Sequence, residues 1–103
     1  MNRFILSIAF ACSLLLLSCS PGRPRYVIGV SQCSDDEWRH QQNAEMRREA
    51  EFYRDLQVVI RTANDDSRQQ VRDIRRFLDE GVDLLVVSPN EAEPITPVVE
   101  EAY

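Results

Sequence analysis

The sequence contains no lysine, so all 12 of its basic residues are arginines, and 17 acidic residues outnumber them to give a formal net charge of −5. A chain with this balance lacks the basic surface that proteins binding nucleic acids normally carry. Only three glycines and five prolines exclude collagen-like and low-complexity chains, and 44% hydrophobic residues argue against a disordered one. At 103 residues, the chain is long enough for one small domain at most.

Residue types that catalyse reactions or bind metals are also scarce. The sequence has one histidine, His40, and only Cys33 remains once Cys12 and Cys19 are assigned to the N-terminal segment described next. These residues cannot form a catalytic dyad, a zinc site or a disulfide within the mature chain. Gly29 lies inside an apolar run and not in a G-x-G-x-x-G turn, which argues against a dinucleotide enzyme. We therefore expect a chain that is not an enzyme and that uses no metal or cofactor.

The N-terminal segment is typical of an export signal. Arg3 precedes an apolar run, residues 4–17, that only two serines interrupt. This run is shorter than the about 20 residues of a membrane span, and its length suits the hydrophobic part of a signal peptide. It ends in Leu16-Leu17-Ser18-Cys19, which resembles the lipobox at which bacterial lipoproteins are processed. A plain secretory signal and an uncleaved anchor are the alternatives.

This interpretation divides the chain into three parts. Residues 1–18 are the signal peptide with its lipobox, and residues 19–25 are a tether too rich in proline and glycine for regular structure. Residues 26–103 form the folded part. Because Cys19 would carry a lipid, the expected location is the periplasm, with the chain held at the membrane through the lipid or through the signal segment.

The folded part alternates between strand and helix patterns. Apolar, β-branched runs predict strands at residues 26–31, 56–62 and 83–88, and the first and third are apolar enough to be buried on both faces. Capping residues and amphipathic spacing predict three helices. The first covers residues 37–53, the second follows the cap cluster 64–67 and ends at Gly81, and the third begins at Pro94 with an inward stripe of Ile95, Val98, Val99 and Ala102.

The order β-α-β-α-β-α predicts an α/β fold with a parallel sheet, right-handed crossovers and helices on both faces. In such sheets ligands bind beyond the carboxyl ends of the strands, where the strand order reverses. If the second strand lies on one side of the first strand and the third strand on the other, this point falls between strands one and three. The loops that follow these two strands, residues 31–38 and 88–93, are therefore the expected site.

Three segments of the folded part resemble a known family. Val30–Arg39, Thr62–Ser67 and Gly81–Asn90 resemble type I periplasmic binding proteins of the ribose-binding and LacI kind, and most closely the periplasmic sensor domain of hybrid two-component regulators. The most specific segment is the string S-Q-C-S-D-D-x-W-R, and the resemblance covers residues 26–103. It implies two α/β lobes that close on a sugar or a similar polar small molecule. In the sensors, a kinase, a receiver and a DNA-binding module follow this domain.

Length is where the chain departs from the family. Members need roughly 250–300 residues for the two-lobed binding unit, a size at which one chain divides into domains. We therefore expect an N-terminal fragment, the truncated three-stranded start of a Rossmann-like lobe, whose exposed sheet edge makes independent stability doubtful. Because such a fragment would supply only half of the cleft, we expect it to bind sugar weakly or not at all.

The two loops supply the candidate ligand-binding residues. Carboxylates and amides hydrogen bond to sugar hydroxyl groups, and an aromatic face packs against the C–H side of a sugar ring. The first loop contributes Asp35, Asp36 and Trp38, and the second contributes Asn90 and Glu91. By resemblance, Asp35 aligns with a polar position that contacts the sugar, and Trp38 aligns with an aromatic residue of the cleft.

Each of these residues has a structural alternative. Asp35 and Asp36 lie where acidic side chains stabilise a helix N-terminus, Trp38 could belong to the core, and Asn90 could only shape its turn. Arg39 could hold a ligand carboxylate, although a surface salt bridge is the commoner role for such an arginine.

The expected function is thus non-enzymatic binding of a small polar solute, a carbohydrate, in the periplasm as the first lobe of a sensor for signal transduction. The alternative is the solute-binding lipoprotein of a sugar ABC importer. An enzyme built on the first half of a Rossmann-like domain would need a phosphate loop, which the sequence lacks. No nucleic acid is expected as a partner of this segment.

Overall fold

The computed structural model describes residues 22–103. The predicted signal peptide, its lipobox with Cys19, and the first part of the tether lie outside the described residues. Within residues 22–103, no helix is both long enough and apolar enough to cross a membrane.

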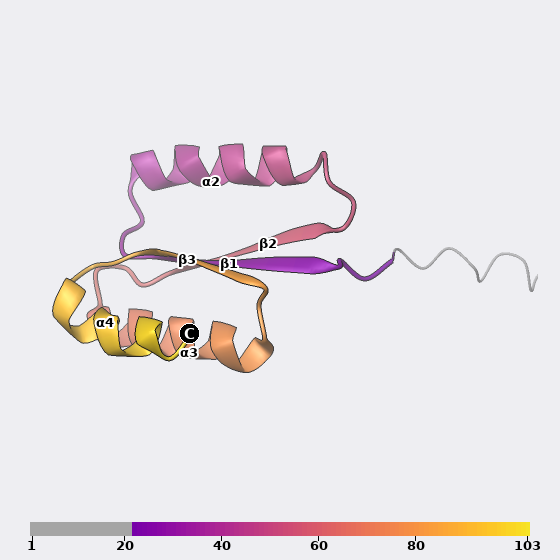
Figure 1. Ribbon diagram of the computed structural model, residues 1–103. Coiled ribbons are helices and arrows are strands. Elements are labelled where there is room, and N and C mark those ends of the chain that lie inside the picture. Colours follow the sequence, from indigo (N-terminus) through magenta and orange to yellow (C-terminus); the bar gives the residue numbers. More distant parts are fainter. Residues whose placement is uncertain (1–21) are drawn as a thin grey trace, which may run out of the picture.

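Strands and helices alternate through the whole described segment, which confirms the predicted α/β class (Figure 1). In chain order they are β1 (Tyr26–Gln32), α2 (Glu37–Ala50), β2 (Leu56–Thr62), α3 (Ser67–Glu80), β3 (Leu84–Ser88) and α4 (Ala92–Glu100). The prediction placed the start of the last helix at Pro94, but α4 begins two residues earlier, after the extended residue Glu91. Pro94 still lies in the first turn, where the missing N–H of proline leaves no hydrogen bond unmade.

The sheet is parallel, as predicted, and its strand order is β2-β1-β3, which is the arrangement that the expected site between strands one and three requires. β1 pairs with β2 along its full length and with β3 over its last five residues, from Ile28 to Gln32. In both ladders the last residue of β1, Gln32, is opposite the last residue of its neighbour, Thr62 in β2 and Ser88 in β3. The three strands therefore end level with one another, and the loops that follow them leave from one edge of the sheet.

Helices cover the two faces of the sheet unequally. α2 lies on one face, and α3 and α4 lie together on the other (Figure 1). The second of these faces holds the core, in which Ile74, Ile95 and Val98 are buried. Apolar residues from α3, β3 and α4 pack around this cluster, namely Val71, Leu78, Leu85, Val87 and Val99.

β1 approaches α3 closely at a glycine. The ring of Phe77 is fully buried beside Gly29, and a β-carbon at position 29 would lie 2.8 Å from Phe77 Cδ1. The guanidinium of Arg61 lies over the same ring, 4.2 Å from its centroid, and forms an ion pair with Glu80. Gly29 thus permits an aromatic ring to contact the backbone of the central strand.

The expectation that β3 is buried on both faces is wrong. Leu84 and Val86 are 53% and 41% exposed, because α2 packs over the side of the sheet formed by β2 and does not extend over β3. An apolar hollow of about 240 Å³ lies between α2 and the sheet, and Leu84 and Val86 line it. Ala102 is likewise exposed and lies beyond the end of α4, so it is not part of the inward stripe.

Candidate ligand-binding site

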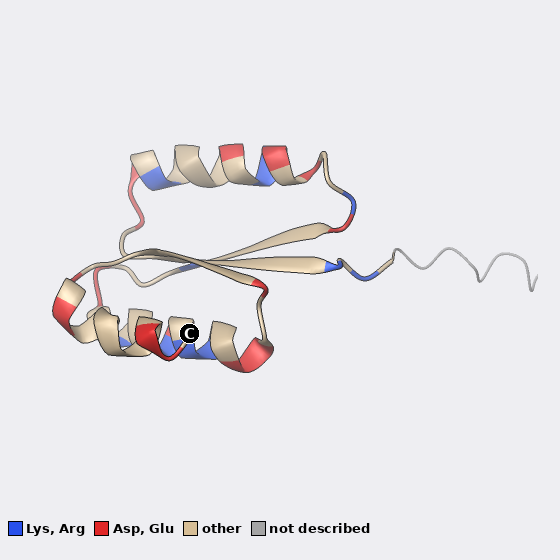
Figure 2. Cartoon of the chain, viewed as in Figure 1, with Lys and Arg blue, Asp and Glu red and all other residues tan. Residues whose placement is uncertain are grey.

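The three loops at the carboxyl edge of the sheet converge. Figure 2 shows acidic segments in all three, on the left of the view. The loop after β2 crosses the end of β1, since Ala63 N donates to Gln32 O at 2.9 Å and Asp65 N donates to Cys33 O at 2.7 Å. This crossing brings the loop after β2 to the loop after β3, although the two strands lie on opposite sides of β1.

Asp36 is the N-cap of α2. Its Oδ1 accepts a hydrogen bond from Arg39 N at 2.9 Å, and its Oδ2 accepts one from Ser34 Oγ at 2.8 Å. The backbone hydrogen bond from Arg39, followed by the one from Ser34, lowers the pKa of Asp36 below its ordinary value because both favour the charged carboxylate. The structural alternative for Asp36, helix capping, is therefore confirmed, and a role in ligand binding stays a prediction.

The lowered pKa of Asp36 predicts a pH-dependent stability that Asp36→Asn removes. The pKa is lower in the folded chain than in the unfolded one, so the stabilisation is complete above the ordinary value of 3.8 and is lost as the pH falls through the folded-state value. Asparagine caps helices as well as aspartate but does not titrate. In urea unfolding at a series of pH values, we expect the wild type to lose stability relative to Asp36→Asn on acidification. A difference that stays constant with pH would contradict the cap.

Asp35 and Trp38 extend from the same N-terminal turn of α2. Asp35 Oδ1 lies 3.2 Å from His40 Nε2, and both side chains are more than half exposed. Trp38 is 72% exposed, so the alternative that placed it in the core is wrong. Its indole ring is open to contact a ligand at this edge of the sheet.

Arg39 is held between β1 and β3. Its Nη1 donates to Ser88 Oγ at 3.2 Å and to Gln42 Oε1 at 3.0 Å, and its Nη2 donates to Cys33 Sγ at 3.7 Å. Within residues 22–103 it forms none of the ion pairs, which contradicts the salt-bridge alternative. A guanidinium with no carboxylate partner thus lies at the point where the strand order reverses.

Asn90 and Glu91 lie on the α3 side of the edge and join two loops. Asn90 Nδ2 donates to Asp65 O at 3.1 Å and to Ser67 Oγ at 2.9 Å, and Ser67 Oγ donates to Glu91 Oε2 at 2.6 Å. The Asn90 side chain therefore bonds to the loop after β2 and not only within its own turn, and its role in ligand binding stays a prediction. Both residues line a hollow of about 430 Å³ together with Asp65, Asp66, Ser67, Arg68 and Pro94.

The structure does not bring the two predicted sets of residues into contact, but a chain of hydrogen bonds connects them. Gln70 Nε2 donates to Ser88 O at 2.8 Å, and Asn90 N donates to Gln70 Oε1 at 2.8 Å. Ser88 also accepts from Arg39, so the path runs from α2 through the end of β3 to the loop of Asn90. Sequence reasoning missed Gln70 and Ser88. Gln70 could have been found from its position one turn before Ile74, on the buried stripe of α3. A polar side chain at a buried position needs hydrogen-bond partners, and this indicates a specific role.

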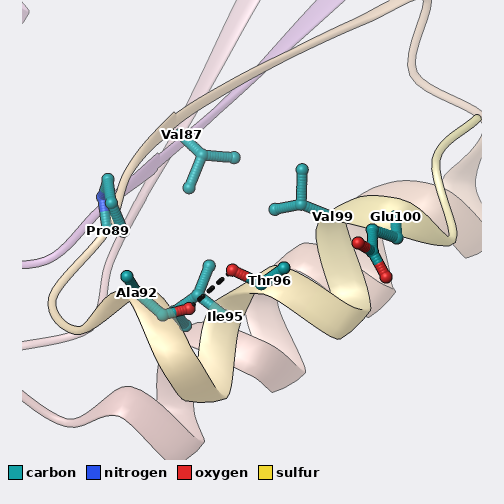
Figure 3. Close-up of a pocket in the computed structure, with 7 residues that line it drawn as sticks. All are labelled: Val87, Pro89, Ala92, Ile95, Thr96, Val99 and Glu100. Atoms are coloured by element: carbon teal, nitrogen blue, oxygen red, sulfur yellow. Dashed lines mark hydrogen bonds between the residues drawn. The ribbon is translucent and has the colours of Figure 1, made fainter.

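A separate hollow of about 300 Å³ lies between β3 and α4 (Figure 3). Apolar side chains form most of its walls, and it contains none of the predicted site residues; it is lined by Val87, Pro89, Ala92, Ile95, Thr96, Val99 and Glu100. The Thr96 hydroxyl already donates to Ala92 O at 2.8 Å. With few free polar groups, this hollow is less suited to a polar ligand than the carboxyl edge.

The groups at this edge are of the kinds that contact small polar ligands in proteins. Carboxylates and an amide oxygen offer acceptors, Arg39 offers donors, and Trp38 offers an exposed aromatic face. In residues 22–103, no group of three histidine, cysteine or acidic side chains is placed to hold a metal ion. An open parallel α/β sheet with polar and aromatic groups at a reversal of strand order defines a module of the class that binds small polar ligands.

Comparison with solved structures identifies which modules of this class the chain resembles. It is 59% identical to the fructose-binding periplasmic domain of a hybrid two-component system, with a TM-score of 0.74 over 76% of this chain and 26% of that one. It is 28% identical to an ABC transporter solute-binding protein from Bacillus halodurans with bound myo-inositol, with a TM-score of 0.70 over 81% of this chain and 29% of the other. A galactofuranose-binding protein is also 28% identical, with a TM-score of 0.67 over 75% of this chain and 26% of its own length.

These structural neighbours are type I periplasmic sugar-binding domains, so the resemblance predicted from the sequence is confirmed. The three-stranded sheet with its helices matches part of a periplasmic-binding-protein lobe. The chain spans about a quarter of the length of the solved structures it matches. No protein-family model and no curated protein matches the chain.

Proposed function

We propose that the chain binds a carbohydrate in the periplasm, without catalysis, at the carboxyl edge of its sheet, and that it forms part of the sensor domain of a two-component signalling protein. The observation that carries this proposal is the 59% identity to the fructose-binding periplasmic domain of a hybrid two-component system, over 76% of this chain. The exposed Trp38 and the carboxylates beside it match what recognition of a sugar ring requires.

In this proposal the two groups of residues have different tasks. Trp38 packs against the C–H face of the sugar, and Asp35 and Asp36 accept hydrogen bonds from its hydroxyl groups. Asn90 and Glu91 contribute the side-chain oxygens that are not used in their hydrogen bonds with Ser67 and Asp65. In the whole protein, the ligand would favour a closed form, and this shift in population would be the signal.

The proposal keeps the predicted division of the chain. Residues 1–18 direct export, Cys19 carries a lipid at the membrane, residues 19–25 form a tether, and residues 26–103 form the binding part. This arrangement would hold the carboxyl edge of the sheet on the periplasmic side of a membrane.

An importer role is the second candidate, because several of the matched structures are solute-binding proteins of ABC transporters, among them those with bound myo-inositol and β-D-glucose. The two candidates share the same ligand class and differ in what the ligand triggers. The DNA downstream of the coding segment separates them. A kinase encoded in the same reading frame supports the sensor, and neighbouring permease genes support the importer.

Sugar binding can be tested on the chain itself with a matched pair of aromatic variants. Trp38 and Phe52 are 72% and 75% exposed and lie at opposite ends of α2. Half a cleft leaves weak and absent binding open, and the proposal requires the first, so we expect D-fructose to shift the amide NMR signals of the carboxyl edge weakly and saturably. Trp38→Ala should weaken this binding by about tenfold, since it removes the aromatic face, and Phe52→Ala should leave it unchanged. Shifts that are absent, or that Phe52→Ala weakens equally, would contradict the proposal.

A further inference from the structure

Gln70 occupies a position that no part of the proposed function explains. Its side chain is fully buried in α3, below the ends of β1 and β3. We propose that Gln70 is a positioning residue, which fixes the loop carrying Asn90 and Glu91 in register with the ends of those two strands. Its effect on ligand binding rests on the proposed function, whereas its effect on the loop does not.

The side-chain amide of Gln70 connects three separate parts of the edge. Its Nε2 donates to Ser88 O at 2.8 Å, at the last residue of β3, and to Ser31 Oγ at 3.3 Å, near the end of β1. Its Oε1 accepts from Asn90 N at 2.8 Å, in the loop after β3. All hydrogen-bonding groups of the amide are thus directed at the candidate site.

Glutamine is the residue type that this position requires. Ser88 O can only accept a hydrogen bond and Asn90 N can only donate one, so the partner must both donate and accept at the same distance from α3. Glutamate keeps the acceptor for Asn90 N but loses the donor for Ser88 O. Methionine has a similar length but offers neither function at useful strength, so Ser88 O, Ser31 Oγ and Asn90 N all lose their hydrogen bond to this side chain.

The remaining contacts of the loop depend on this anchor. With Asn90 N held by Gln70, the Asn90 side chain reaches Asp65 O and Ser67 Oγ, and Ser67 Oγ in turn donates to Glu91 Oε2. Ser88 also accepts from Arg39 through its own hydroxyl group. A shift of the loop would therefore move Asn90 and Glu91 together, relative to Trp38 and Arg39.

Amide hydrogen exchange measured by NMR on the full chain tests the anchor. In Gln70→Met we expect the Asn90 amide to exchange at least about tenfold faster than in the wild type, because its acceptor is gone. In Gln70→Glu, which retains the acceptor, the exchange rate of Asn90 should stay close to that of the wild type. The Val30 amide in the core of β1 reports global unfolding and should change much less than Asn90 in both variants.

Gln69→Met is the matched control, since the Gln69 side chain donates within α3, to Asp73 Oδ1 at 2.8 Å, and not to the loop. It should leave the exchange of Asn90 unchanged. The inference is overturned if Gln70→Met leaves Asn90 protected, or if Gln70→Glu loses protection as fully as Gln70→Met. Should the methionine variant not fold, Gln70→Asn takes its place, because its amide is one methylene too short to reach Asn90 N; protection retained at Asn90 in that variant overturns the anchor, and lost protection supports it.

The consequence for the ligand is measured separately. D-fructose titrations of Gln70→Met should show weaker binding than the wild type, while the fluorescence of the sole tryptophan, Trp38, stays unchanged in the absence of sugar. If the wild type binds no sugar, the proposed function is wrong. The exchange rate of the Asn90 amide then still tests whether Gln70 anchors the loop.

Discussion

Truncation of Ile74 to alanine is expected to destabilise the fold by about 2–5 kcal/mol, the cost of removing a large aliphatic side chain from a tightly packed interior. Ile74 is fully buried, and it lies in the cluster with Ile95 and Val98 that joins α3 to α4. Small domains are stable by only about 5–15 kcal/mol, so this one substitution removes a large share of the total. Urea unfolding followed by circular dichroism measures the change.

Leu84→Ala is the matched control for this prediction. Leucine and isoleucine have nearly the same volume, but Leu84 is 53% exposed on the face of β3 that α2 leaves uncovered. Its truncation should cost less than about 1 kcal/mol. An equal loss of stability in Leu84→Ala and Ile74→Ala would show that the face of β3 is covered in solution and would contradict the arrangement of the two layers.

Alanine at position 29 is expected to destabilise the fold by about 1–3 kcal/mol through overpacking. The added β-carbon would lie 2.8 Å from Cδ1 and 2.9 Å from Cγ of Phe77, whose ring is fully buried. The better strand propensity of alanine offsets only about 0.5–1 kcal/mol of this cost. Chemical unfolding of the variant and the wild type under the same conditions gives the difference.

Two further variants establish that the cost comes from the Phe77 ring. Gly22→Ala adds the same methyl group at a position with nothing within 4 Å, and should be neutral. Phe77→Leu removes the ring, so Gly29→Ala should cost clearly less in a Phe77→Leu background than in the wild type, as expected for residues in contact. Strictly additive effects would mean that the two residues do not meet.

The sequence pattern predicts the fold well because every element carries its own local signal. Asp66 caps α3 by accepting hydrogen bonds from Arg68 N and Gln69 N, and Gly81 ends it in the left-handed conformation with a φ of 69°. Aspartate is typical of the residue that caps the start of a helix and glycine of the residue that ends one, so the sequence pattern indicates both roles. The strand order β2-β1-β3 is predicted from the sequence only as a condition, because right-handed crossovers also allow the order β1-β2-β3; in the observed order they place α2 and α3 on opposite faces.

Burial on the two faces could not be predicted in the same way. An apolar run such as Leu84–Ser88 shows that a strand can be buried, but the helices of the chain decide which face is covered, and α2 does not extend over β3. The contacts of Arg39 and Gln70 could not be predicted from the sequence either. Their partners, Ser88 and Asn90, are distant in sequence, and only the converging ends of the strands bring them within reach.

The candidate site is divided between two helical layers that differ in how many of their residues are buried against the sheet. α2 buries only Asn43, whereas α3 buries Gln70, Asp73, Ile74 and Phe77. Segments that bury little open locally at a lower free energy than segments that form the core. The amides of α2, the helix that follows Asp36 and carries Trp38 and Arg39, are therefore expected to exchange with solvent faster than those of α3. Asn90 is bonded to the buried Gln70 of α3, so the two parts of the candidate site belong to segments of unequal local stability.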